Sequence, residues 1–457
     1  MTRSSGSTGA VVGASRDMPN ATLPTAIGAP SLYAWYVAVV LSAAHLVSFI
    51  DRFVMGLLVQ PMRATLGLSD AQLGLLQGSA FALLYAIAGV PLGRLADLRS
   101  RRVLIACGIT FWSVATAACA FADGFWSLFG ARLLVGVGEA ALVPAAMSLL
   151  AAYFTRKHIG RAISIFTTGA SLGKTTALIG GAALLTLFGS RTLSVGGHVL
   201  LPWQGVFLSA AMVGLVLVPL VLTIAEPPRR ARDDAGGSGL RDALEYLKRN
   251  AAPFALHTIA AGAVVLLVQA FGAWAPAYFA RVRGYSVVEA GYVVGFIALV
   301  TGPAGGLSGG WAIDRLHRAG VREAALNVIL LGLSVALPMA LLLITLPNGV
   351  GPLIAFAFFM FAISTTVASC LAGLQVITPE RHRGTVTSIY MCVITLTAVG
   401  LGPLLVGVVS DLLAENGRSL GVALGGVTII VGMIGIIAAA GGRSSVRRLA
   451  TAIEKQD

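Results

Sequence analysis

The segment ARLLVGVGEAALVPA, residues 131–145, lies inside an apolar run from 126 to 151 whose charged residues are Arg132 and Glu139. Because a helix rises about 1.5 Å per residue, roughly 20 mostly apolar residues cross the hydrocarbon core of a bilayer. The run is therefore predicted to span a membrane. Eleven further runs meet the same description: 33–57, 71–93, 102–122, 160–188, 203–225, 253–280, 286–311, 324–346, 350–376, 384–412 and 419–441. The breaks are predicted at polar or Gly/Pro clusters that include Pro61, Pro202, Pro347 and Pro379.

The composition predicts an all-α integral membrane protein. Hydrophobic residues make up 57% of the 457 residues and charged residues 11%, whereas a soluble domain carries about 25% charged residues. A water-exposed surface cannot be built from so few charges. The four cysteines lie in apolar runs without metal-ligand spacing, so we expect packing roles for them, no metal and no cofactor.

The distribution of Lys and Arg orients the spans. With both termini placed in the cytosol, the cytosolic segments hold 24 of the 32 Lys and Arg residues, the outer loops hold 5, and the rest lie within spans. This asymmetry follows the positive-inside rule. It also accounts for the net charge of +13 without a nucleic-acid partner. We therefore expect a multi-pass protein of the cell inner (plasma) membrane, in contact with membrane lipids.

The spans fall into two six-helix, pseudo-symmetric bundles joined by a polar linker. The linker opens with Pro and charged residues and continues as a short amphipathic helix with Leu240, Leu244 and Leu247 on one face. The predicted domains are a disordered cytoplasmic tail (1–32), the N-terminal bundle (33–225), the cytoplasmic linker (226–252), the C-terminal bundle (253–441) and a second cytoplasmic tail (442–457).

One motif recurs at the cytosolic end of the second and the eighth span. Gly93 precedes Asp97 by four residues, and Gly310 precedes Asp314 by four. Two related halves are typical of transporters built from parallel repeats. We expect a cytoplasmic gate formed by these motifs and their basic neighbours, and the alternative is a solvated charge cluster. The gate residues are Gly93, Asp97, Arg101, Arg102, Asp314 and Arg315.

The sequence resembles the major facilitator superfamily over all twelve spans. The run from Gly93 to Arg102 is similar to the family's loop motif between the second and third helices, with departures at Leu98 and Ser100. Arg132-x-x-x-Gly136-x-Gly138-Glu139 resembles the motif of the fourth helix. Four stretches resemble the spinster-like group: YAWY (33–36), SFIDR (48–52), ARLLVGVGEAALVPA (131–145) and GLGPLLVGVVSD (400–411).

The resemblance implies a function. Spinster proteins of animals export or carry lysophospholipids and sphingosine phosphates, with proton coupling. It therefore implies a monomeric secondary transporter that moves a small amphipathic or anionic substrate, with a lysophospholipid or lipid-like molecule favoured, together with protons.

Five charged residues stand out because they lie well inside spans: Asp51, Arg52, Arg132, Glu139 and Lys174. A charge at the bilayer centre costs about 2.5–3.5 kcal/mol by insertion scales, so each needs a partner or a watery cavity. The helix rise puts Asp51 and Arg132 at one depth, roughly 9 Å to the outer side of the midplane, where they can pair. Glu139 is predicted to be the main protonation site because burial favours a neutral acid, with Asp51 as a second site controlled by Arg52 and Arg132. A static salt-bridge network is the alternative.

Other residues are candidates for substrate contact. Lys174 stands where the resembling group usually has a small residue, and it can pair with Glu139, bind an anionic head group, or remain neutral or snorkel. His45 lies on the same helical stripe as Arg52 and either faces the cavity or packs. Gln269 and Trp274 either line the cavity or anchor the outer end of the seventh span.

The chain carries no HExxH, no GxSxG and no complete Walker motif, so neither an enzyme nor an ATP-driven pump is predicted. The favoured interpretation is a proton-coupled transporter that works by alternating access. A proton-linked drug or organic-anion antiporter is the alternative within transport. A membrane receptor or scaffold with the same fold is the alternative outside it.

Overall fold

The computed structural model describes residues 31–155, 157–189, 193–195, 198–228, 239–413 and 419–454. Within this part of the chain, twelve helical segments are long and apolar enough to cross a membrane. The protein is therefore a multi-pass membrane protein, as its composition predicts. The first 30 residues of the predicted tail and residues 229–238 of the predicted linker lie outside the described residues.

The first six spans form the N-terminal half. They are α1 (Leu32–Leu66), α2 with α3 (Asp70–Gln77, Ser79–Leu98), α4 (Arg101–Ala120), α5 with α6 (Phe125–Glu139, Leu142–Tyr153), α7 (Ile159–Gly189) and α8 (Pro202–Leu222). A short antiparallel pair, β1 (Leu193–Val195) and β2 (His198–Leu200), lies between α7 and α8.

The linker helix and six further spans follow. They are α9 (Leu240–Arg249), α10 (Ala251–Arg283), α11 (Val287–Arg318), α12 (Ala324–Thr345), α13 (Val350–Val376) and α16 (Ser419–Glu454), with the eleventh span made of η1 (Glu380–His382), α14 (Arg383–Ile394), η2 (Thr395–Val399) and α15 (Gly400–Leu412). The η2 segment is a π-helical turn inside that span.

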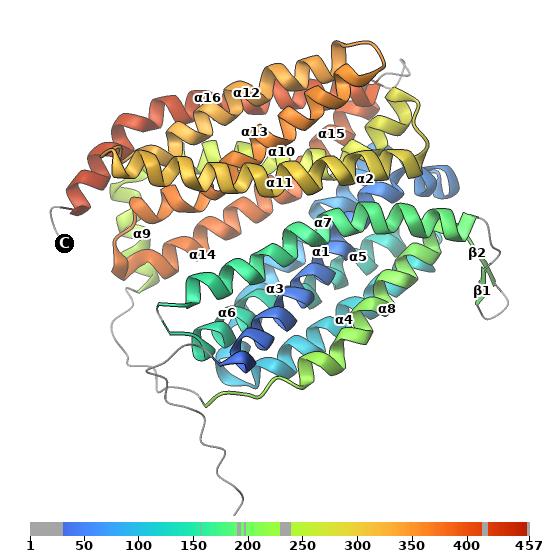
Figure 1. The fold of residues 1–457 in the computed structure, drawn as a ribbon, viewed down its shortest axis with the longest axis horizontal. Coiled ribbons are helices and arrows are strands. Elements are labelled where there is room, and N and C mark those ends of the chain that lie inside the picture. The colour runs from blue at the N-terminus through green and yellow to red at the C-terminus, as the bar shows by residue number, and fades with distance from the viewer. Residues whose placement is uncertain are drawn as a thin grey trace, which may run out of the picture.

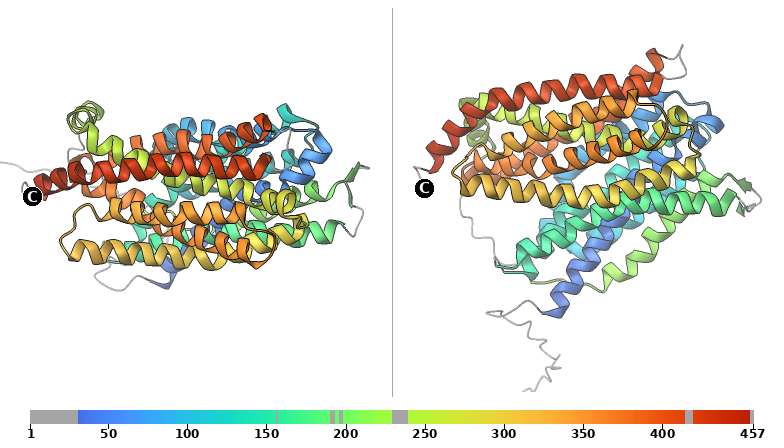
Figure 2. Two further views of the ribbon diagram at one scale, coloured as in Figure 1. Left: turned by 90° about the horizontal axis from the view of Figure 1, so that it is seen from above. Right: turned by 45° about the horizontal axis from the view of Figure 1, so that its top comes forward.

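The two halves lie side by side, with the N-terminal half in blue to green and the C-terminal half in yellow to red (Figure 1). The largest contacts between them are made by α1 with α10, α7 with α11, and α2 with α15. The helices run roughly alongside one another in all views (Figure 2). We call the end of the molecule that carries α2 and α15 the α2/α15 end, and the opposite end, near α9, the linker end.

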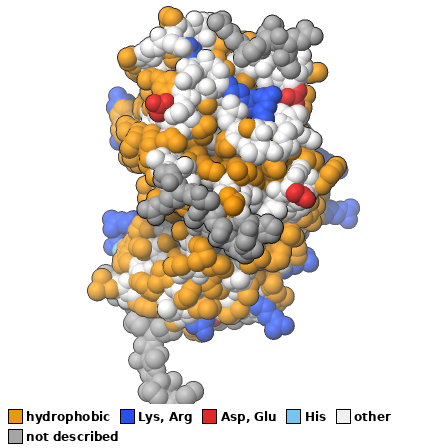
Figure 3. All heavy atoms as spheres, turned by 90° about the vertical axis from the view of Figure 1, so that its right-hand side faces the viewer, with side chains coloured by type: hydrophobic (Ala, Val, Ile, Leu, Met, Phe, Trp, Pro, Cys, Tyr) orange, Lys and Arg blue, Asp and Glu red, His pale blue; other side chains and the backbone are white. Residues whose placement is uncertain are grey.

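Apolar side chains cover much of the outer surface, as a lipid-facing protein requires. Leu307 on α11 is 77% exposed and Val216 on α8 is 71% exposed. Figure 3, which looks onto the α2/α15 end, shows hydrophobic side chains along the flanks and only scattered charged groups.

Helix boundaries differ most from the sequence-based prediction at the end of the first span and at the C-terminus. The break predicted at Pro61 is wrong: α1 contains Pro61 and ends at Leu66, and the following Gly67, with a φ of 64° and an N–H bond to the Arg63 carbonyl, caps it. The segment predicted as a tail from 442 is helical to Glu454. Two ion pairs tie this extension to the α11–α12 loop, Arg322–Glu454 at 2.7 Å and Arg447–Glu323 at 3.5 Å.

Candidate functional site

The buried charges meet where α1, α5 and α3 pack together. The Arg52 Nη2 lies 2.6 Å from the Glu139 Oε2, and the Ser48 hydroxyl donates to the same oxygen at 2.6 Å. The Glu139 side chain is fully buried, whereas that of Arg52 is 15% exposed. The Arg52 guanidinium also lies 4.0 Å from the centroid of the Phe81 ring, a cation–π contact. A buried acid is thus paired with a cation that is itself partly exposed.

Asp51 and Arg132 lie close together, but their side chains do not form the predicted ion pair. The Arg132 Nη1 donates to the main-chain carbonyl of Asp51 at 3.2 Å, and its Nε donates to that of Leu76 at 3.4 Å. Among the described residues, neither carboxylate oxygen of Asp51 has a hydrogen-bond partner. Of the two acids, Glu139 is the one that forms an ion pair, and its partner is Arg52.

Lys174 and His45 both lie beside the Phe49 ring, whose centroid is 5.0 Å from that of His45. The Lys174 Nζ lies 4.8 Å from the centroid of the Phe53 ring and 5.6 Å from that of Phe49. His45 is buried, stacks on Phe166 with centroids 4.2 Å apart, and its Nδ1 lies 3.0 Å from the Phe166 carbonyl oxygen. These contacts are those of a packing histidine, whereas Lys174 contacts aromatic rings.

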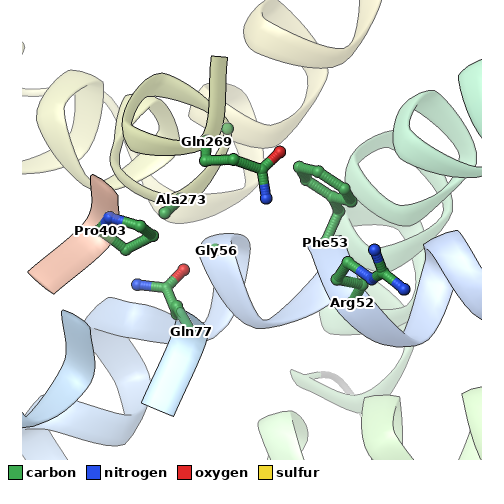
Figure 4. A pocket seen from close by; sticks show the side chains of 8 residues that line it. Arg52, Phe53, Gly56, Gln77, Gln269, Ala273 and Pro403 are labelled. Carbon is green, nitrogen blue, oxygen red and sulfur yellow. The ribbon is translucent and has the colours of Figure 1, made fainter. Parts of the chain in front are cut away.

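A small pocket lies between the halves beside these charges, with room for about one water molecule. Its lining comes from both halves: Arg52, Phe53, Gly56, Gln77, Gln269, Gly272, Ala273 and Pro403. The Gln269 amide points toward the Phe53 ring across the pocket (Figure 4). Trp274 does not line it, since its fully buried indole donates from Nε1 to the Pro403 carbonyl at 2.9 Å.

A charge network that the sequence analysis missed joins the halves at the α2/α15 end. Arg281 of α10 donates from Nη1 to both Asp70 oxygens at 2.7 Å and from Nε to Gln60 at 2.7 Å. The Ser410 hydroxyl donates to Asp70 at 2.7 Å. Asp411 accepts the N–H groups that begin α2, from Asp70 at 3.0 Å and from Ala71 at 2.7 Å, so its charge lies at the positive end of the helix.

Backbones touch at the same end. A Cβ added to Gly74 would lie 2.6 Å from the Pro403 carbonyl oxygen, so only glycine lets α2 approach α15 this closely. The Ser79 hydroxyl donates to the Gly400 carbonyl at 2.9 Å, next to the π-helical turn. The α2/α15 end is therefore closed by both charge and close packing. The sequence signals were the capping box at Ser69–Gln72 and the acid at Asp411.

The predicted gate residues lie at the linker end, and the buried Arg101 is the best connected of them. It donates from Nε to Glu226 at 2.7 Å and from Nη2 to the Pro227 carbonyl at 2.9 Å, while the Arg102 N–H also donates to Glu226. Burial raises the pKa of Glu226, but the hydrogen bonds from Arg101, Arg102 and Ser100 outweigh it and lower the pKa overall. These bonds fasten α4 to the chain after α8, within one half.

The remaining gate residues are solvent-facing. Asp97, Asp314 and Arg315 are exposed, and Arg315 lies 5.5 Å from the Trp311 ring centroid. Gly93 is half-buried, with Pro144 of α6 in van der Waals range of an added Cβ.

Residues 41–403 match the family described as the Major Facilitator Superfamily. The chain is 27% identical over 400 residues to an MFS-type efflux pump of Mycolicibacterium smegmatis, covering 86% of this chain and 88% of that one. It is 28% identical to human protein spinster homolog 1, covering 83% and 74%. It is 26% identical to the zebrafish (Danio rerio) sphingosine-1-phosphate transporter SPNS2 over 252 residues, covering 53% and 47%.

The fold is similar to that of a solved bacterial homolog of the human lysosomal transporter spinster. That structure is described as inward-facing and unoccupied, and it superimposes with a TM-score of 0.77 at 23% identity, covering 93% of this chain and 99% of that chain.

Proposed function

The chain belongs to the Major Facilitator Superfamily and is a membrane transporter rather than an enzyme, and we propose that it moves an amphipathic, lipid-like substrate by alternating access with proton coupling. The relatives named as spinster and sphingosine-1-phosphate transporters support a lysophospholipid-like substrate. The small pocket between the halves has charge on one side and aromatic and amide groups around it, the groups that an amphipathic molecule would contact once the halves move apart.

We infer that the linker end faces the cytosol, because the bias of Lys and Arg lies there. The conformation closed at the α2/α15 end is then the one closed to the outside. In alternating access the two halves rock about the central site, so the outer network breaks when the linker end closes. Gly93, Asp97, Arg101, Arg102, Asp314 and Arg315 would form the gate in that second state.

The observation that carries the proton coupling is the buried Arg52–Glu139 pair beside the pocket. Breaking a buried pair leaves an uncompensated charge, so the pair has two stable arrangements: ionised and paired, or protonated and released. Protonation of Glu139 frees Arg52, which is the part of the pair that reaches the pocket. Asp51, fully buried next to Arg132 and without a hydrogen-bond partner among the described residues, is the second proposed titrating acid.

The test replaces Glu139 by glutamine, which keeps the shape and removes the titration. In proteoliposomes, Glu139→Gln is expected to lose pH-gradient-driven uptake while retaining substrate exchange at equal pH. The matched control is Glu245→Gln, which removes an exposed acid from α9. A Glu139→Gln variant with the wild-type rate and pH dependence would remove Glu139 from the coupling mechanism.

A second candidate is a proton-linked antiporter that exports drugs or organic anions, favoured by the likeness to the mycobacterial efflux pump. The two candidate functions differ in the molecule that crosses the membrane. Offering a lysophospholipid, an aromatic acid and a cationic drug in separate vesicle preparations distinguishes them, because only the transported class moves protons.

A further inference from the structure

The charged residue Lys174 takes no part in the proton coupling proposed above. It lies half-buried on α7, with its Nζ over the rings of Phe53 and Phe49. Phe53 lines the pocket between the halves. The part of the chain that the structure describes offers Lys174 no carboxylate within ion-pair distance, and its charged neighbour is Arg52. A cation is therefore held against an aromatic wall beside the pocket without a counter-charge.

Arg52 borders the same aromatic wall. Its guanidinium carbon lies 4.9 Å from the Phe49 ring centroid, where the Lys174 Nζ lies at 5.6 Å. The Phe49 ring thus has two cations beside it, Arg52 from α1 and Lys174 from α7. Like charges in a partly buried site repel each other, and a bound anion relieves that repulsion.

The net charge of the whole cluster also favours a bound anion. Three cations, Arg52, Arg132 and Lys174, accompany two acids, Asp51 and Glu139. The cluster is positive even when both acids are ionised, and more so when either is protonated. A site of this kind favours an anion over a cation or a neutral molecule.

Building on the transport function proposed above, we propose that Arg52 and Lys174 together bind the anionic head of an amphipathic substrate, a phosphate, sulfonate or carboxylate on an apolar chain, and that protonation of Glu139 makes Arg52 available to it. Phe49 and Phe53 contact the first part of the apolar chain. Gln269, which points toward Phe53 from the other half, donates to the head group (Figure 4). Lys174 thereby selects for negative charge.

The proposal couples two ligands. While Glu139 is ionised it holds Arg52 at 2.6 Å, so Lys174 alone meets the anion. Once Glu139 is protonated, both cations meet it. By linkage, the proton and the anion each strengthen the binding of the other. The titratable and charged groups that face the pair are His45 and Asp51 of α1, Tyr85 of α3, Arg132 of α5 and Lys174 of α7.

The test measures binding, so it does not depend on transport. The probe is decanesulfonate, whose head group stays ionised across the pH range, titrated into protein in nanodiscs at mildly acidic and mildly alkaline pH. Decyltrimethylammonium and decyl maltoside, with the same chain and a cationic or neutral head, are the ligand controls. The wild-type protein is expected to bind decanesulfonate most tightly, and more tightly at acidic pH.

Variants separate the parts of the proposal. Lys174→Gln is expected to weaken decanesulfonate binding at both pH values by at least about tenfold, the loss of one charge-assisted hydrogen bond, while decyl maltoside binding is unchanged. Lys174→Arg restores binding, and Lys248→Gln on the exposed face of α9 has no effect. Glu139→Gln binds decanesulfonate tightly at both pH values.

Equal decanesulfonate affinity in wild type and Lys174→Gln would overturn the anion site, and unchanged pH dependence in Glu139→Gln would overturn the coupling to Arg52. Decyl maltoside binding by each variant shows that the pocket is folded. Failure of the proposed function has a different signature: decanesulfonate binds as expected, yet no amphiphile crosses the membrane of proteoliposomes.

Discussion

Asp70 is the residue through which the closed α2/α15 end can be opened by a single change. Its side chain is 3% exposed, and it holds Arg281, itself only 11% exposed, through both carboxylate oxygens. Removing one charge of a buried pair costs about 3–5 kcal/mol. Gln60 still accepts from Arg281 and asparagine keeps one acceptor, so we take the lower value for Asp70→Asn. A cost of about 3 kcal/mol shifts a two-state equilibrium about a hundredfold away from the closed α2/α15 end.

The assay is a distance distribution between spin labels at Thr65 of α1 and Leu412 of α15, both exposed at this end, in a variant without the four native cysteines. Asp70→Asn is expected to add a population at longer distance. Glu245→Gln is the matched control, since the Arg249–Glu245 pair on α9 is 75% and 55% exposed and its loss leaves the halves unaffected. An Asp70→Asn distribution identical to that of the parent would refute the reasoning that this network holds the end closed.

Two further predictions concern packing and pH. Gly74→Ala puts a Cβ 2.6 Å from the Pro403 carbonyl oxygen, so the same labels should move apart, and an unchanged distribution would contradict the close-packing argument. Glu226 has a lowered pKa in the folded protein, so the stability it contributes is complete above its ordinary value of 4.5 and is lost as pH falls through the lowered value. Glu226→Gln should therefore melt below the wild type at neutral pH and approach it in strong acid, whereas a difference that stays constant with pH would contradict the link to Arg101.

The sequence predicts the fold well because the lipid bilayer restricts which backbone structures can cross it. A bilayer forces each apolar run to satisfy its own backbone as a helix, so all twelve spans can be identified from apolar length alone. Pro61 is an exception to the rule that proline ends a helix: a transmembrane helix tolerates the missing N–H of a proline, and α1 continues to Leu66.

The site is only partly predictable from the sequence. Helix rise gives depth but not rotation, so Asp51 and Arg132 were rightly placed near each other, yet the ion pair is the one between Arg52 and Glu139. The Asp70–Arg281 network joins residues 211 positions apart through the packing of the two halves, which no local pattern encodes. Trp274 was open to two interpretations until its indole was seen bonded to Pro403.

Coupling of substrate movement to protons can be measured in proteoliposomes that contain an internal pH dye and carry an imposed pH gradient. Lysophospholipids and sphingoid lipids are added beside small organic anions and cationic drugs. Proton flux is expected to begin when an amphipathic anion is added, to be absent from empty vesicles and to be abolished in Glu139→Gln. Substrate uptake without any proton movement, in vesicles whose protein still binds that substrate, would contradict the coupling.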